Sequence, residues 1–119
     1  MRLVVTLPPG GPTDILARYI GQKLGDTFSQ QFVIDNRTGG GGNIGAEIVA
    51  KAPPDGHTLF MATSGPMAIN VSLFRKLPYD PVRDFAPIVL AAQASHVLVV
   101  NPSLPVKTVS EFRSEEHTS

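Results

Sequence analysis

Short apolar runs alternate with amphipathic segments along the first half of the chain. Residues 3–7, 32–34 and 59–62 have the length and continuous hydrophobicity of buried strands. Between these runs, apolar residues recur at helical spacing over about residues 12–27, and again from 44 to 52. The resulting order of strand, helix, strand, helix, strand predicts an α/β fold with a parallel sheet and right-handed crossovers.

The second half of the chain carries weaker signals. Residues 73–84 have no clear period, and the run Tyr-Asp-Pro at 79–81 predicts a turn. Apolar runs at 87–91 and 97–100 are two further strand candidates. Thr108 and Glu111 have the spacing of a capping box, so we expect a helix to begin there.

Three loops rich in glycine, hydroxyl and amide residues follow the first three predicted strands. They cover residues 8–13, 37–43 and 63–65, and ligands of open parallel sheets bind at that edge. Gly10 and Gly11 allow close backbone approach, and the following helix presents unpaired N–H groups to a carboxylate or phosphate. A tight turn in which Asp14 satisfies the helix start explains the first loop equally well.

The second loop also satisfies a dinucleotide-binding pattern. Residues 40–45 read Gly-Gly-Gly-Asn-Ile-Gly, which matches G-x-G-x-x-G. The acidic residue that should end the next strand is replaced by Thr63 and Ser64. We therefore favour glycines that let the second helix pack closely on the sheet, and keep a dinucleotide-binding enzyme domain as the alternative.

Composition and residue spacing argue against several other kinds of chemistry. Basic and acidic residues number 10 each, which gives no electrostatic reason to expect nucleic acid as a partner. The chain has no cysteine, and its three histidines are widely spaced, so we expect no metal site and no cofactor. Ser64 lacks a nucleophile elbow, so we expect it to donate hydrogen bonds and expect no catalytic residue.

Several of these segments together resemble one family. Residues 3–14, LVVTLPPGGPTD, resemble the first strand and loop of the solute-binding proteins of tripartite tricarboxylate transporters, the Bug family. Residues 36–45, NRTGGGGNIG, followed by Pro-Asp-Gly at 54–56, are similar to that family's second signature. The segments LPYDP at 77–81 with Asp-Phe at 84–85, and VVNP at 99–102, resemble two more.

The resemblance implies a truncated two-lobed periplasmic binding protein of type II-like fold. Such proteins close two α/β lobes on a small carboxylate or dicarboxylate and deliver it to membrane permease subunits. They hold the carboxylate with backbone amides, hydroxyls and waters. On this basis the ligand residues are expected in the first and third loops, with Asn43 and Asn70 as weaker assignments. The full set is Leu7, Gly10, Gly11, Pro12, Thr13, Asn43, Thr63, Ser64, Gly65 and Asn70.

The chain departs from the family in the first loop and in its length. Thr6 and Leu7 stand where the family commonly has Pro-Phe, which changes the surroundings of the ligand. We expect residues 1–92 to belong to the first lobe and residues 93–112 to begin the second. The polar heptapeptide at 113–119, RSEEHTS, resembles a translated sequencing adapter, so we expect it to be a non-native tail. The intact parent is expected to be periplasmic, with a leader that this chain lacks.

Overall fold

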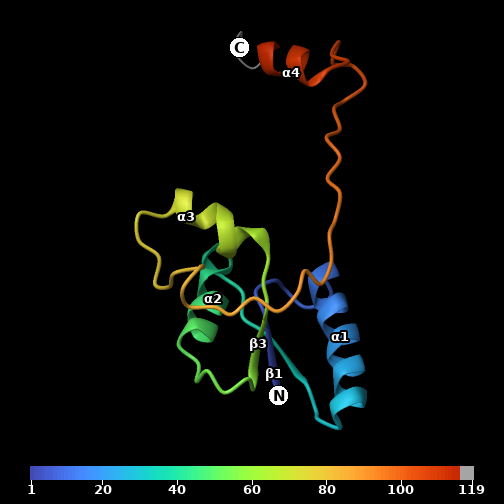
Figure 1. Ribbon diagram of the computed structural model, residues 1–119. Coiled ribbons are helices and arrows are strands. Elements are labelled where there is room, and N and C mark those ends of the chain that lie inside the picture. Colours follow the sequence, from blue (N-terminus) through green and yellow to red (C-terminus); the bar gives the residue numbers. More distant parts are fainter. Residues whose placement is uncertain (116–119) are drawn as a thin grey trace. The chain divides into compact units, whose positions relative to one another are not determined.

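A computed structural model of the chain describes residues 1–115 and contains two compact units, Met1–Pro87 and the segment from Ile88 onward. The first unit contains a three-stranded sheet and the helices that flank it (Figure 1).

The sheet of the first unit is parallel, with strand order β2-β1-β3. Strands β1 (Arg2–Val5), β2 (Val33–Asn36) and β3 (Thr58–Met61) pair so that Val5 lies opposite Asn36 and Met61. Because β1 is hydrogen-bonded on both sides, its side chains are the most buried of the three: Val4 and Val5 are fully buried. All three strands therefore end at the same edge.

Two helices flank this sheet. Helix α1 (Pro12–Phe28) packs against β1 and β2, and α2 (Asn43–Ala50) packs against β1 and β3 (Figure 1). Between α1 and the sheet lies a small apolar core, made by Leu3, Val5 and Ala17 together with Ile34, Leu59 and Met61. The predicted three strands, two helices and parallel pairing are confirmed. Only the boundaries differ, because β1 stops at Val5 and α2 at Ala50.

Gly45 lets α2 approach the sheet closely. A Cβ at this position would lie 2.8 Å from Cγ2 of Thr6 and 2.9 Å from the backbone oxygen of Arg37. Real Cβ atoms do not approach so closely, and the Arg37 contact is with backbone that cannot rotate away. The prediction that glycines of the 40–45 pattern serve close helix packing is confirmed at this position.

The third loop holds helical structure that the sequence pattern did not indicate. After β3 the chain forms a short π-helical segment, η2 (Gly65–Ile69), and then one turn of α-helix, α3 (Asn70–Leu73). These two segments are too short for the spacing of apolar residues alone to predict a helix. The turn predicted at 79–81 is present, and Asp80 accepts hydrogen bonds from the backbone N–H groups of Val82 and Arg83.

In the second unit the strand predictions are wrong and the helix prediction is right. Residues 87–91 and 97–100 form no strand, and Val97 and Val99 are 81% and 80% exposed. A strand needs a neighbour for its backbone hydrogen bonds, and the described residues supply none for these runs. Helix α4 (Val109–Glu115) begins as predicted, because Glu111 N–H donates to Thr108 Oγ1 and Thr108 N–H to Glu111 Oε2.

Two predictions about the end of the chain remain predictions. The lobe boundary expected after residue 92 falls inside the second unit. Residues 113–115 of the expected tail belong to α4, and residues 116–119 lie outside the described part of the chain. Within the described residues, no helix is both long and apolar enough to cross a bilayer.

Replacing Gly45 by alanine should destabilise the protein by about 1–3 kcal/mol, because the added methyl overlaps the Arg37 carbonyl and the Thr6 methyl. Thermal or urea unfolding followed by circular dichroism measures the change. Lys51→Ala, at an exposed position just after the same helix, is the control and should change stability by about 0.5 kcal/mol or less. Equal stability of Gly45→Ala and wild type would contradict the close packing.

Candidate functional site

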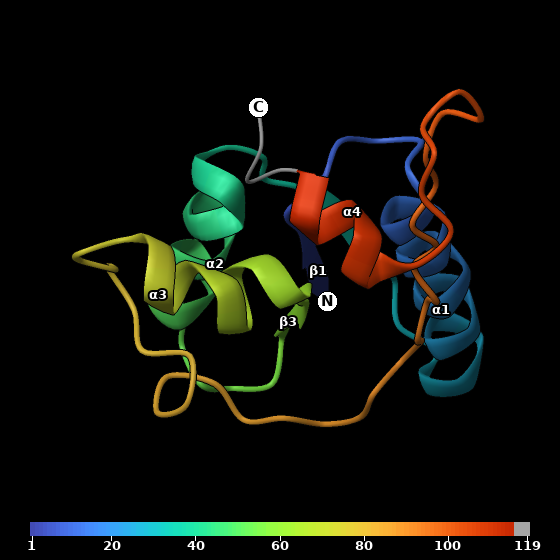
Figure 2. The same ribbon diagram turned by 90° about the horizontal axis from the view of Figure 1, so that it is seen from above.

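The three loops predicted from the sequence lie at one edge of the sheet. They follow the carboxyl ends of β1, β2 and β3, and Figure 1 shows all three chain segments leaving the sheet at the same end. Seen from above, the first loop leaves the central strand β1 toward α1, and α2 lies on the other side of β1 (Figure 2). We call this group of loops the carboxyl rim.

Two helices begin at the carboxyl rim without a side-chain cap. Helix α1 starts after Gly11, with Pro12 in its first turn, and α2 starts after Gly42. Neither N-terminus receives a side-chain hydrogen bond, and the first turn of α2 contains no acidic residue. Unpaired N–H groups and the positive end of the helix dipole attract an anion, so the start of α2 suits a carboxylate, whereas the first turn of α1 already contains Asp14.

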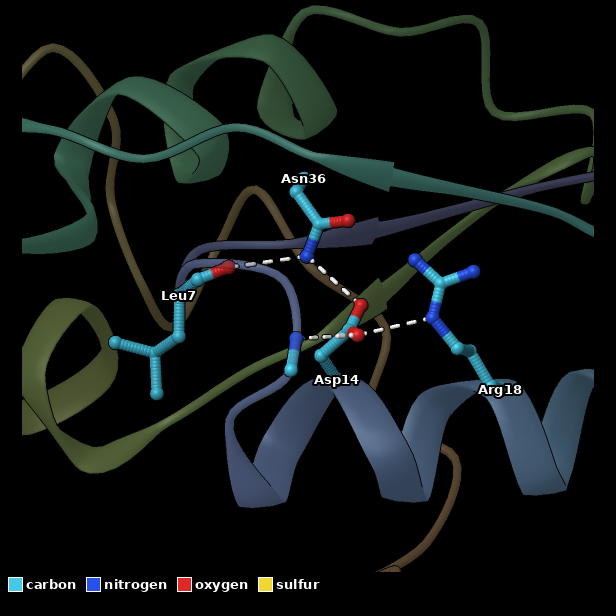
Figure 3. Close-up of polar contacts among 5 residues, drawn as sticks. Leu7, Asp14, Arg18 and Asn36 are labelled. Atoms are coloured by element: carbon cyan, nitrogen blue, oxygen red, sulfur yellow. Dashed lines mark hydrogen bonds and ion pairs between the residues drawn. The ribbon is translucent and has the colours of Figure 1, made fainter.

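Asp14, in the first turn of α1, fixes the first loop through hydrogen bonds (Figure 3). Its carboxylate accepts hydrogen bonds from the Gly10 N–H at 2.9 Å, from Arg18 Nε at 2.9 Å and from Asn36 Nδ2 at 2.9 Å. Asn36 Nδ2 also donates to the Leu7 carbonyl at 3.0 Å. Residues of α1 and β2 therefore fix both ends of the loop, and we call this group the Asp14 brace.

The Asp14 brace keeps a negative charge beside the carboxyl rim and compensates it. Asp14 is 2% exposed. The hydrogen bonds from Arg18, from the Gly10 N–H and from Asn36 lower the pKa of Asp14 from 3.8 to about 2. The carboxylate therefore stays ionised at all ordinary pH values, and the Arg18 guanidinium offsets its charge.

The brace changes what each residue of the first loop can offer a ligand. The Gly10 N–H is directed to Asp14 and is not available to a solute. Gly10 has a φ of +83°, which glycine adopts without strain. Leu7 and Pro12 are exposed, while Gly11 and Thr13 are partly exposed. Of the predicted residues in this loop, Thr13 offers its hydroxyl, and the Gly11 N–H makes only a long contact of 3.5 Å with the Pro8 carbonyl.

Asn43 and Asn70 form a second buried polar group with Tyr79. Asn70 Nδ2 donates to Asn43 Oδ1 at 2.7 Å and to the Gly41 carbonyl at 3.0 Å. The Tyr79 hydroxyl lies 2.7 Å from Asn43 Oδ1 and 2.8 Å from the Pro66 carbonyl. Burial raises the pKa of the Tyr79 phenol, which keeps its proton available for donation.

This asparagine–tyrosine cluster joins the second loop to the third. Asn43 is 8% exposed, Asn70 5% and Tyr79 6%, so the hydrogen bonds of this cluster lie inside the protein. Direct ligand contacts of the two asparagines remain a prediction, whereas their support of the glycine loop is observed. The role of Tyr79 was not predicted, because only the fold brings it within reach of residues 36 and 13 positions earlier.

The third loop lies against the second. A Cβ added at Gly65 would be 3.4 Å from the Gly41 carbonyl and 3.9 Å from Thr63 Oγ1. Ser64 is exposed, and Thr63 and Gly65 are partly exposed. The structure thus brings all ten predicted residues to the three loops or directly beneath them, with eight of them accessible and the two asparagines buried.

The carboxyl rim contains no arginine clamp from Arg37. The Arg37 Nε donates to Asp35 Oδ1 at 2.8 Å, and Asp35 also forms an ion pair with Arg2. The described residues include no group of three or more His, Cys, Asp or Glu side chains that could hold a metal ion. One open depression of about 470 Å³ lies along residues 71–84. Another of about 560 Å³ lies along α1 and Phe32. None of the ten predicted residues lines either depression.

The profile of the tripartite tricarboxylate transporter family receptor matches residues 16–116 of the chain. The chain belongs to this family. Among curated relatives, the UPF0065 protein in the tcbD-tcbE intergenic region of a Pseudomonas species is 47% identical over 82% of the chain. Protein BugT of Bordetella pertussis is 37% identical over 92% of the chain. The chain spans 29% and 34% of the lengths of these two relatives.

Several solved structures that are similar in sequence have the same fold as this chain. The R. palustris protein Rpa4515 with adipate is 44% identical, with a TM-score of 0.80 over 98% of the chain. MatC from Rhodopseudomonas palustris with bound malate is 37% identical, with a TM-score of 0.75 over 98% of the chain. A structure described as a periplasmic transporter is 36% identical, with a TM-score of 0.72.

The chain covers 39% to 40% of these three structures. The predicted family and the α/β fold of a periplasmic binding protein, of which this chain covers only a part, are therefore confirmed.

Replacing Asp14 by asparagine should destabilise the protein at neutral pH, because an amide cannot accept all three hydrogen bonds of the Asp14 brace. The folded-state pKa, about 2, lies below the ordinary 3.8. The stability that ionised Asp14 contributes is therefore complete above about pH 4 and is lost as pH falls toward 2. Melting temperatures of wild type and Asp14→Asn should accordingly differ at pH 5–8 and converge as the pH falls toward 2. Asp26→Asn, at an exposed position of the same helix, should give no such pattern.

Replacing Tyr79 by phenylalanine should cost about 1–3 kcal/mol of stability, because the buried Pro66 carbonyl loses its partner in the asparagine–tyrosine cluster. Denaturant unfolding measures this cost. Tyr19→Phe removes a hydroxyl from a residue that is 60% exposed, and should change stability by about 0.5 kcal/mol or less. Equal effects of the two variants would show that the Tyr79 hydroxyl bonds contribute nothing.

Proposed function

We propose that this chain is the opening part of a two-lobed periplasmic solute-binding protein, which captures a small carboxylate or dicarboxylate for a tripartite tricarboxylate-type transporter. The observation that carries the proposal is the carboxyl rim. Two uncapped helix starts and three glycine-rich loops meet at one edge of a parallel sheet in a chain of the receptor family.

The chemistry of the rim suits an acid group held by neutral donors. Gly11, Thr13, Thr63, Ser64 and Gly65 offer backbone N–H groups and hydroxyls, and these are accessible or partly so. Such donors stabilise a carboxylate through hydrogen bonds and the helix dipole without a permanent ion pair. Reversible capture follows, because release does not require breaking a buried salt bridge. Two similar solved structures contain adipate and malate, which are both carboxylates.

The rival hypothesis is a dinucleotide-binding enzyme that uses residues 40–45. Gly45 serves the approach of α2 to β1, and Gly42 lies against Pro66 and Thr6, so both glycines are needed for packing within the protein. Gly40 is exposed and is not explained in this way. We propose a receptor without catalytic activity, because the chain belongs to a receptor family and two similar solved structures contain a bound carboxylate. Membrane permease subunits are its proposed partners.

The decisive experiment is a ligand screen of the full-length gene product that contains this chain. Adipate, malate and related acids should raise its melting temperature by several degrees at concentrations about a hundredfold above Kd, whereas NAD should not. Calorimetry then gives the affinity of each acid. A shift with NAD and none with any carboxylate would reject the receptor and favour the rival.

The 119-residue chain alone should bind the same acids with negligible affinity. One lobe leaves the solute open to water on one side, and enclosure supplies much of a small ligand's binding energy. Calorimetry of this chain beside the full-length product tests the expectation. Micromolar binding by the short chain would show that a second lobe is not needed.

A further inference from the structure

Thr6 carries a buried hydroxyl that the fold does not satisfy. The residue directly follows β1 and is 2% exposed. Within the described part of the chain, its Oγ1 is the buried side-chain polar atom without a hydrogen-bond partner. Such a hydroxyl has given up its bonds to water and gained nothing in return, and native proteins rarely keep one without a functional reason.

The groups that enclose Thr6 belong to the carboxyl rim. A Cβ added at Gly42 would lie 3.3 Å from Thr6 Cβ and 3.2 Å from the ring of Pro66. A Cβ added at Gly45 would lie 2.8 Å from the Thr6 methyl. Thr6 therefore lies where the second loop, Pro66 and the end of the central strand meet.

The backbone of the second loop encloses Thr6 together with the Pro66 ring. The second loop passes through four successive glycines, 39–42, with φ values of 113°, 57°, 65° and 93°. These residues have no side chains, so this loop lies beside Thr6 with its backbone only. Contact between the hydroxyl and a solute at the rim requires this loop to be displaced, because Thr6 is 2% exposed.

We propose that Thr6 is a specificity-determining residue of the solute site, and that its hydroxyl donates a hydrogen bond to a carboxylate oxygen of the bound solute. The inference rests on the proposed function and adds a residue that lies outside the ten predicted ones. The hydroxyl gains its partner only when the solute is bound, so the empty protein retains an unsatisfied donor and the complex does not.

This role makes stability and affinity respond in opposite directions when the hydroxyl is removed. Valine has nearly the same shape as threonine and no polar atom on its side chain. Thr6→Val removes the unsatisfied group from the empty protein and should stabilise it. The same change removes a hydrogen bond to a charged oxygen from the complex and should weaken binding.

The test uses the full-length gene product with Thr6→Val, Thr6→Ser and the control Thr27→Val, which alters an exposed threonine of α1. Melting is measured without ligand, and calorimetry is done with adipate and with malate. We expect Thr6→Val to melt several degrees higher than wild type and to bind both acids about tenfold or more weakly. Thr6→Ser should keep most of the affinity, and Thr27→Val should bind like wild type.

Each other outcome overturns the inference. Unchanged affinity in Thr6→Val would make the hydroxyl a packing defect, and a lower melting temperature would show that it already has a partner. A loss confined to malate would place the contact on the solute hydroxyl and not on the carboxylate. If wild type binds neither acid nor any other carboxylate, the proposed function itself fails, independently of the Thr6 variants.

Discussion

The pairing of β1 with a strand on each side is the constraint on which the rest of the structure depends. Its register places Val5 beside both Asn36 and Met61, so three chain segments leave the sheet together. The loops cannot separate without breaking backbone hydrogen bonds of the most buried strand. A short sheet of four-residue strands can therefore position a binding edge, although its apolar core is small.

The loops at that edge are held by polar groups directed inward. Asp14 and Asn36 fix the first loop through the Gly10 N–H and the Leu7 carbonyl, and Asn43, Asn70 and Tyr79 fix the second against the third. The charged and amide side chains of these groups make hydrogen bonds within the protein. What remains for a solute are backbone groups and hydroxyls, which agrees with an acid captured reversibly by neutral donors.

Close packing at the rim has a consequence for stability. Gly45 allows α2 to reach β1, and the same contact closes over Thr6 and leaves its hydroxyl without a partner. A sequence optimised only for folding would place an apolar residue there. Departures from such local rules gather at functional sites, where stability is given up for binding.

The sequence by itself determined the order of the three strands with the two helices between them, the parallel sheet, the edge that carries the glycine loops and the start of α4. These features depend on hydrophobic period and on capping residues a few positions apart, which are local signals. Tertiary structure alone decided the partners of the buried polar groups. Asn36 and Asp14 are 22 residues apart, and Tyr79 and Asn43 are 36 apart, so no local pattern joins them. It also decided that the apolar runs at 87–91 and 97–100 form no strand, because a strand exists only where another segment accepts its hydrogen bonds.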